Sequence, residues 1–162
     1  AKHQSRLNWC PFFRGKPISS GRQGAGNQVF VEFLGPNTLR FGFDHWAVGA
    51  TYSRPIVCDF AQRHVIVVSF GGLYPDETSA RFRENPRWQT LLHNVVVKFD
   101  GEPVIAREID CYPSQPQSIA LFHNLIGFST AVRDFTGRLF SASPVAPDDV
   151  LSAVGDLERQ KR

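Results

Sequence analysis

The sequence predicts an all-β fold, a sandwich of two antiparallel sheets followed by a short C-terminal helix. Many short runs alternate apolar and polar side chains, which is the two-residue period of a strand. Turn-forming residues separate these runs, and one pair of runs reads as a β-hairpin. A chain of 162 residues is long enough for one domain with a sizeable core.

The clearest element is the hairpin over residues 94–109. Val95, Val97 and Phe99 alternate with Asn94, Val96 and Lys98 along its first strand. Asp100 and Gly101 follow, and this dipeptide adopts positive φ angles at little cost, as a tight primed turn requires. A second β-rich run over 104–109 returns, so the segment predicts two adjacent antiparallel strands.

The same two signals, alternating side chains and turn residues, predict the elements before the hairpin. Residues 29–34 alternate and predict a strand, and 35–37 predict a turn. Leu39, Phe41 and Phe43 share one face of the next strand, and a polar and aromatic loop is expected over 44–52. A short strand is expected over 56–60. The run 63–70 is apolar on both faces, which predicts a central, buried strand.

The remaining chain contains one long interruption and a helical end. Residues 71–93 form the longest break in the strand pattern, and an insertion of this length is often functional and can hold a short helix. Strands are expected over 118–122 and 135–141. Asp148 or Asp149 can cap a helix whose apolar side carries Val150 and Val154.

The positive charge of the chain is concentrated near its start. Residues 1–28 carry five basic side chains and no acidic one. We therefore expect three regions: a basic, irregular N-terminal arm over 1–28, a β-sandwich domain over 29–147, and a C-terminal helix or linker over 148–162. The five charges form no compact patch, so no nucleic-acid partner is expected. No apolar run approaches the roughly 18 residues of a membrane span.

The three cysteines leave the redox state open. Cys10, Cys58 and Cys111 could form one disulfide and one free thiol, or could all be reduced. Their spacing fits no zinc motif. Cys58 and Cys111 lie in or beside strand-like segments, where a buried free cysteine acts as a small apolar side chain.

Three segments resemble a laminin G-like domain of the concanavalin A-like jelly-roll superfamily. RHVIVVSF (63–70) is similar to the central strand of that family, and VVVKFDGEPVI (95–105) to its hairpin. The segment 119–145 is similar to its closing strands, with Phe135, Gly137 and Leu139 as the Phe-x-Gly-x-Leu element. The resemblance covers roughly 29–145 and implies a jelly-roll sandwich. It also implies an extracytoplasmic or cell-surface location, and some family members bind calcium.

The superfamily includes glycoside hydrolases, which use two carboxyl groups that flank the scissile bond. Glu108 and Asp110 are spaced to share a face, as in the Glu-x-Asp-x-x-Glu pattern of retaining β-glucanases. Pro113 occupies the third acidic position, so the pattern fails at a functional residue. The sequence therefore favours a protein that is not an enzyme, with a glycoside hydrolase as the weaker alternative.

Loop-borne aromatic side chains beside polar ones are typical of sugar-binding sites, because an aromatic ring packs against the apolar face of a pyranose. Such residues predict a non-catalytic ligand-binding module of a larger cell-surface or secreted protein, most plausibly one for carbohydrate. The alternative is a structural or protein–protein interaction domain that binds a neighbouring protein domain. No cofactor is expected, although calcium stays possible. The candidate ligand-binding residues are Asp44, His45, Trp46, Tyr52, Tyr74, Arg87, Trp88 and Asn124.

Overall fold

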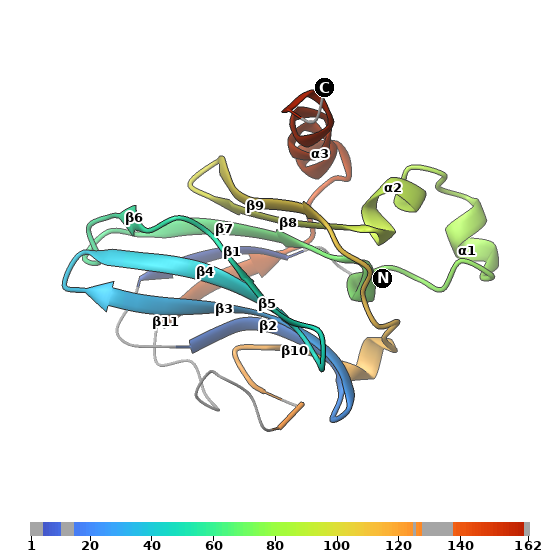
Figure 1. The fold of residues 1–162 in the computed structure, drawn as a ribbon, viewed down its shortest axis with the longest axis horizontal. Coiled ribbons are helices and arrows are strands. Elements are labelled where there is room, and N and C mark those ends of the chain that lie inside the picture. The colour runs from blue at the N-terminus through green and yellow to red at the C-terminus, as the bar shows by residue number, and fades with distance from the viewer. Residues whose placement is uncertain (1–4, 11–14, 125, 128–137, 161–162) are drawn as a thin grey trace.

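The chain forms two antiparallel sheets that pack against each other, with helices at one end and on one outer face (Figure 1). The computed structural model describes residues 5–10, 15–124, 126–127 and 138–160. This architecture confirms the coarser part of the predicted fold class, namely a mostly β fold with antiparallel sheets and a short C-terminal helix.

The first sheet holds five strands, and its centre is the run that the sequence marks as buried on both faces. Strand β7 lies between β1 and β8, and the central position explains why valine and isoleucine occupy both of its faces. In spatial order the strands are β11 (Arg138–Ser143), β1 (Ser5–Cys10), β7 (His64–Ser69), β8 (Asn94–Phe99) and β9 (Glu102–Glu108).

The second sheet lies below the first in Figure 1 and contains the long β3–β4 hairpin. The short strand β6 (Ile56–Val57) pairs with the start of β4, at the opposite end from β5. The other strands, in spatial order, are β10 (Ile119–Leu121), β2 (Gly15–Arg22), β3 (Ala25–Gly35), β4 (Thr38–His45) and β5 (Gly49–Tyr52).

The main core lies between the sheets. Leu39, Phe41 and Phe43 of β4 are almost completely buried there, as their alternation predicts. They face Ile66 and Val68 of β7, together with the inward side chains of β8. Strands β3, β4, β7 and β8 thus place every second side chain in one apolar layer, which fixes the register of these strands.

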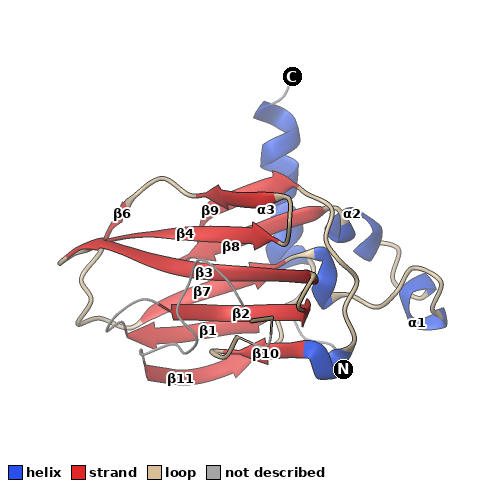
Figure 2. Ribbon diagram, turned by 60° about the horizontal axis from the view of Figure 1, so that its bottom comes forward, coloured by secondary structure: helices blue, strands red, loops and turns tan. Residues whose placement is uncertain are grey.

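Helices α2 and α3 pack on the outer face of β7, β8 and β9, as Figure 2 also shows. Val150 and Val154 of α3 are buried against this face, in agreement with the predicted apolar side of that helix. The break over 71–93 holds three short helices of its own. The helical segments are η1 (Gly71–Leu73), α1 (Ala80–Arg83), α2 (Trp88–Leu92), η2 (Pro116–Ser118) and α3 (Asp148–Gln160).

Residues 1–28 differ from the expected irregular arm. Strand β1 pairs with β7 on one side and β11 on the other, and β2 pairs with β3 and β10. Main-chain hydrogen bonds form without regard to side-chain type, so a segment rich in glycine, serine and basic residues can still supply strands to both sheets. That contribution comes from long-range pairing, which composition alone does not reveal.

Residues 44–52 also differ from the expected loop. Strand β4 continues to His45, and β5 begins at Gly49, so only a short turn separates them. Ala47 and Gly49 have φ angles of 61° and 121° in this turn. A positive φ at alanine is unusual, which is why the sequence gives no clear signal of a hairpin here.

Candidate functional site

A cleft of about 540 Å³ opens at the end of the sheets where the 71–93 insertion meets residues 109–118. We call residues 109–118 the strap, because they leave the end of β9 and run toward β10. The floor of the cleft is largely apolar, and its wall carries carboxylate, hydroxyl and imidazole groups. The side chains used below are Tyr74, Asp76, Glu77, His93, Asp110 and Cys111.

His93 connects the two walls of the cleft. Its Nδ1 lies 2.6 Å from Oδ1 of Asp110 on the strap, and its Nε2 lies 3.6 Å from Oε1 of Glu77 on the insertion. The hydrogen bond to Asp110, and then the negative charges of Asp110, Glu77 and Glu108, raise the pKa of His93 above its ordinary value. The imidazole therefore holds its proton more tightly than a free histidine does.

The β8–β9 ladder brings His93 and Asp110 together. Ile109 N donates to His93 O at 2.9 Å, which extends the pairing of the two strands by one residue pair beyond their ends. Asp110 is the next residue along the strap, so its carboxylate reaches the ring of His93. Sequence reasoning missed His93 as a site residue, because a bulge between Val97 and Lys98 shifts the register that the Asp-Gly turn alone would predict.

Tyr74 forms part of the cleft floor, and contacts with Ser69 and Trp88 fix its side chain. Its side chain is buried, and its hydroxyl lies 2.6 Å from Ser69 Oγ. The ring of Trp88 lies 6.1 Å away and also packs against Phe82. Tyr74 and Trp88 thus join the apolar layer between α2 and the first sheet, and Trp88 supports the cleft without lining it.

The acidic wall of the cleft is a hydrogen-bonded turn. Asp76 Oδ1 accepts from Thr78 N at 2.8 Å and from Thr78 Oγ1 at 2.6 Å. Ser79 is the N-cap residue of α1: its Oγ accepts from Phe82 N and donates to Asp76 O. These bonds restrict the wall, so that its carboxylates have defined positions before any ligand arrives.

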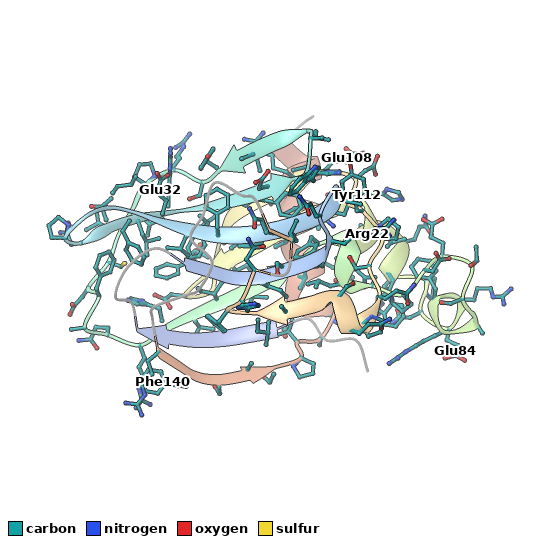
Figure 3. The ribbon with its side chains drawn as sticks, turned by 90° about the horizontal axis from the view of Figure 1, so that it is seen from below. Arg22, Glu32, Glu84, Glu108, Tyr112 and Phe140 are labelled. Atoms are coloured by element: carbon teal, nitrogen blue, oxygen red, sulfur yellow. The ribbon has the colours of Figure 1, made fainter. Side chains whose placement is uncertain are left out.

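The strap is anchored to the second sheet through Tyr112 (Figure 3). Asn27 is buried, and its amide accepts from Tyr112 N at 3.1 Å and donates to Tyr112 O at 2.9 Å. The Tyr112 hydroxyl donates to Trp46 O at 3.2 Å, and its ring makes an edge-to-face contact with the ring of His45, with 4.5 Å between the ring centres. One strap residue therefore contacts the β4–β5 turn, while its neighbours line the cleft.

Cys111 lines the cleft as a thiol. Burial raises the pKa of Cys111 to about 11, and this effect exceeds the lowering caused by the amides of Gly71 and Gly72. Burial likewise raises the pKa of Cys58 to about 11. Both cysteines are free, and at neutral pH neither is the thiolate that nucleophilic chemistry needs. The side chain of Cys10 lies outside the described residues.

The side chains of the first predicted cluster do not share one face of the second sheet. This cluster consists of Asp44, His45, Trp46 and Tyr52. Asp44 lies on the outer face of the second sheet, where Gln28 Nε2 donates to it at 3.0 Å, whereas His45 alternates to the inner face. Tyr52 also lies on the outer face, with the Arg40 guanidinium 4.1 Å from its ring centre. Trp46 sits at the turn, so these four side chains do not converge on one point.

Two buried atoms near this cluster lack hydrogen-bond partners. They are Gln28 Oε1 and His45 Nδ1, the two such side-chain atoms found across the described part of the chain. They belong to adjacent rungs of the β3–β4 pair, since Gln28 pairs with Asp44 and Asn27 with His45. An unsatisfied buried polar atom is uncommon in folded proteins.

The other predicted residues have structural contacts. Arg87 is exposed and forms an ion pair with Asp148 at the start of α3, which ties the insertion to that helix. Asn124 accepts from Ile126 N at 2.9 Å and donates to Gly127 O at 3.2 Å. Of the predicted residues, Tyr74 lines the cleft, and Trp88 packs against the ring of Tyr74.

No family model matches the chain, and no curated protein or solved structure is significantly similar to it. Within the described ranges, no group of three or more histidine, cysteine or acidic side chains is placed to hold a metal ion. No helix in those ranges is long and apolar enough to cross a membrane.

Proposed function

We propose that this chain is a non-catalytic ligand-binding module that binds a carbohydrate in the cleft between the 71–93 insertion and the strap. The observation that carries this proposal is the His93 bridge above an apolar floor. Carboxylate and imidazole groups at fixed positions bind hydroxyl groups well, and apolar walls suit the C–H face of a sugar ring. Tyr74 and Leu92 contribute such apolar surface.

The fold supports the same proposal at a coarser level. Two packed antiparallel sheets are compatible with a concanavalin A-like jelly roll, to which the 63–70 and 95–105 segments have the resemblance described above. On this reading the module belongs to a larger cell-surface or secreted protein. Calcium is a possible additional ligand.

The positions and contacts of the carboxyl groups, and the protonated state of the Cys111 thiol, favour a non-catalytic role. The carboxylate of Asp110 is hydrogen-bonded to His93, and Glu108 ends β9 outside the lining of the cleft. The Cys111 thiol is protonated at neutral pH. Release of reducing sugar from the ligand would instead support a glycoside hydrolase.

A glycan array tests the proposal. The purified chain is applied with calcium or with a chelator, beside the variants Asp110→Ala, His93→Ala and Trp46→Ala. We expect binding that Asp110→Ala and His93→Ala reduce at least tenfold, while Trp46→Ala has a smaller effect because Trp46 does not line the cleft. Arg83→Ala, at an exposed position of α1, serves as the control.

The outcomes separate the alternatives. Binding that only Trp46→Ala abolishes would move the site to the β4–β5 turn. Silence across the array under both calcium conditions would contradict carbohydrate binding and favour a protein-interaction domain. Thermal unfolding of each variant must remain cooperative, so that loss of binding is not loss of the fold.

A further inference from the structure

A groove of about 610 Å³ lies on the open side of the sandwich and shares no described lining residue with the cleft. One wall is the segment 52–56, which connects the edge strand β5 to β6. The other wall is residues 103–107 of β9, the edge strand of the first sheet. A groove of this volume lies in the range that small organic ligands occupy.

Strand β9 places Arg107 at this groove. Ile105 and Arg107 pair with Val97 and Val95 of β8, and both valines are buried in the main core. Side chains two positions apart on a strand share a face, so Arg107 lies on the inner face together with Ile105. Ile105 is buried, whereas Arg107 is exposed. Arg107 therefore lines the groove from the first sheet.

Arg54 lines the opposite wall, and its main chain is held at the edge of β4. Ser53 is buried beside it: Ser53 N donates to Phe41 O at 2.9 Å, and Ser53 Oγ accepts from Phe41 N at 2.9 Å. The same hydroxyl donates to Arg54 O at 2.8 Å. Pro55 follows, and a residue before proline favours an extended conformation. Arg54 thus extends from a backbone with a defined position.

The two arginines bring like charges to one groove. Both are exposed, and no acidic side chain is among the described lining residues. Neither arginine belongs to an ion pair found across the described part of the chain, whereas Arg40 and Arg87 each pair with a carboxylate. Two guanidinium groups without a counter-charge favour an anion between them, and their planar fork matches a carboxylate.

The rest of the groove favours an apolar ligand body. Ile56, Val104 and Ile105 line it beside the arginines, and all three pack in or against the main core. Each wall also contains a proline, Pro55 or Pro103, which has no N–H to donate. Proline is a common means of blocking an edge to a further strand. Side chains, and not strand pairing, therefore recognise the occupant.

We infer that this groove binds a small organic anion, whose carboxylate lies between Arg54 and Arg107 and whose apolar body packs on Ile56 and Val104. An inorganic anion would leave the apolar surface unused. An extended peptide would need the main-chain donors that the prolines lack. This site is independent of the carbohydrate cleft, because the two share no described residue.

An NMR titration of the full, isotope-labelled chain tests the inference. A fragment library of aromatic and aliphatic carboxylic acids is added, and the same fragments as primary amides are the uncharged counterparts. We expect acids to shift the amide signals of residues 104–107 and the Nε–H signals of both arginines, while the matched amides do not. The tightest acid should bind at least tenfold more weakly to Arg54→Glu/Arg107→Glu.

The controls separate the groove from general charge effects. Arg22→Glu/Arg83→Glu carries the same charge change outside the groove and should bind the acid within twofold of the wild type. His93→Ala, in the cleft, should also bind it within twofold, whatever the glycan array shows. If the charge-reversed variant does not unfold cooperatively, Arg54→Gln/Arg107→Gln replaces it.

Four outcomes would overturn the inference. They are the absence of any acid that shifts these signals, equal binding of the matched amide, equal binding of inorganic sulfate, and equal binding to the charge-reversed variant. An acidic dodecapeptide that binds where every small acid fails would also overturn it, and would assign the groove to a protein partner.

Discussion

Gly42 allows the ring of Phe30 to lie across β4 on the outer face of the second sheet. A Cβ atom at Gly42 would meet the Phe30 ring at 2.1 Å, and the ring is 4% exposed. Because the ring has little room to move, Gly42→Ala should lower the free energy of unfolding by about 1–3 kcal/mol. Urea unfolding of the variant measures this change directly.

Gly35→Ala is the matched control, because nothing lies within 4 Å of a Cβ atom placed there. We expect this change to alter stability by less than about 0.5 kcal/mol. The double variant Phe30→Ala/Gly42→Ala should lose less stability than the two single changes together, since the overlap is gone. Strict additivity would contradict a steric origin for the effect.

His93 makes a pH-dependent contribution to stability. Its pKa is raised in the folded state by Asp110, so its bound proton stabilises the fold. This contribution is complete below the ordinary histidine value of about 6.5 and is lost as the pH rises through the folded-state value. We expect His93→Gln to destabilise the protein more at pH 5.5 than at pH 8.5.

The size of this effect is limited by solvent, because the His93 side chain is 49% exposed and that of Asp110 is 85% exposed. The difference between the two pH values should therefore stay below about 1 kcal/mol. Urea unfolding of wild type and His93→Gln at each pH measures it, and groups common to both proteins cancel. In Asp110→Asn the pH-dependent part should largely disappear. A difference that grows with pH would mean that the bridge has been misassigned.

At the scale of elements, the β8–β9 turn also holds the start of β7. Asp100 and Gly101 have φ angles of 50° and 94°, as the predicted primed turn requires. The Asp100 carboxylate lies 2.7 Å from His64 Nδ1 and accepts from Val65 N at 2.8 Å. His64 is buried, and its Nε2 donates to Asp59 O.

Removing the Asp100 carboxylate should therefore lower the stability of the protein more than the substitution of a turn residue usually does. Asp100→Gly keeps the positive φ but leaves His64 and Val65 without this partner, so we expect a loss of about 2–3 kcal/mol. Asp100→Asn keeps a polar group and a good turn dipeptide, and should lose about 1 kcal/mol or less. Thermal or urea unfolding compares the two, and an equal loss would assign the effect to the turn alone.

The β8–β9 hairpin also shows which features of the structure can be predicted from the sequence and which cannot. Its strands and turn are local, so alternation and one Asp-Gly dipeptide predict them from adjacent residues. The β4–β5 turn was missed because Ala47 has a conformation that alanine rarely adopts. The bridge between His93 and Asp110 was missed because it depends on the register of the hairpin, which includes a bulge.

At the scale of the whole molecule, composition gives a wrong prediction for segments whose strands pair with distant parts of the chain. The basic residues before position 28 predicted an arm, yet β1 and β2 are interior strands of two different sheets. The candidate residues were likewise chosen for their types. Asp44 and His45 are neighbours in sequence and point to opposite faces, whereas Tyr74 and Asp110 are 36 positions apart and line one cleft.

The interior positions of β1 and β2 make these two strands essential to the fold. Deleting residues 1–22 would remove β1 from between β7 and β11, and β2 from between β3 and β10. It would also remove Ile18, which is fully buried in the main core. We expect the truncated chain to show no cooperative thermal transition by circular dichroism, and narrow amide dispersion in its NMR spectrum. A dispensable arm predicts the opposite, namely a truncated chain with a cooperative transition close to that of the full chain.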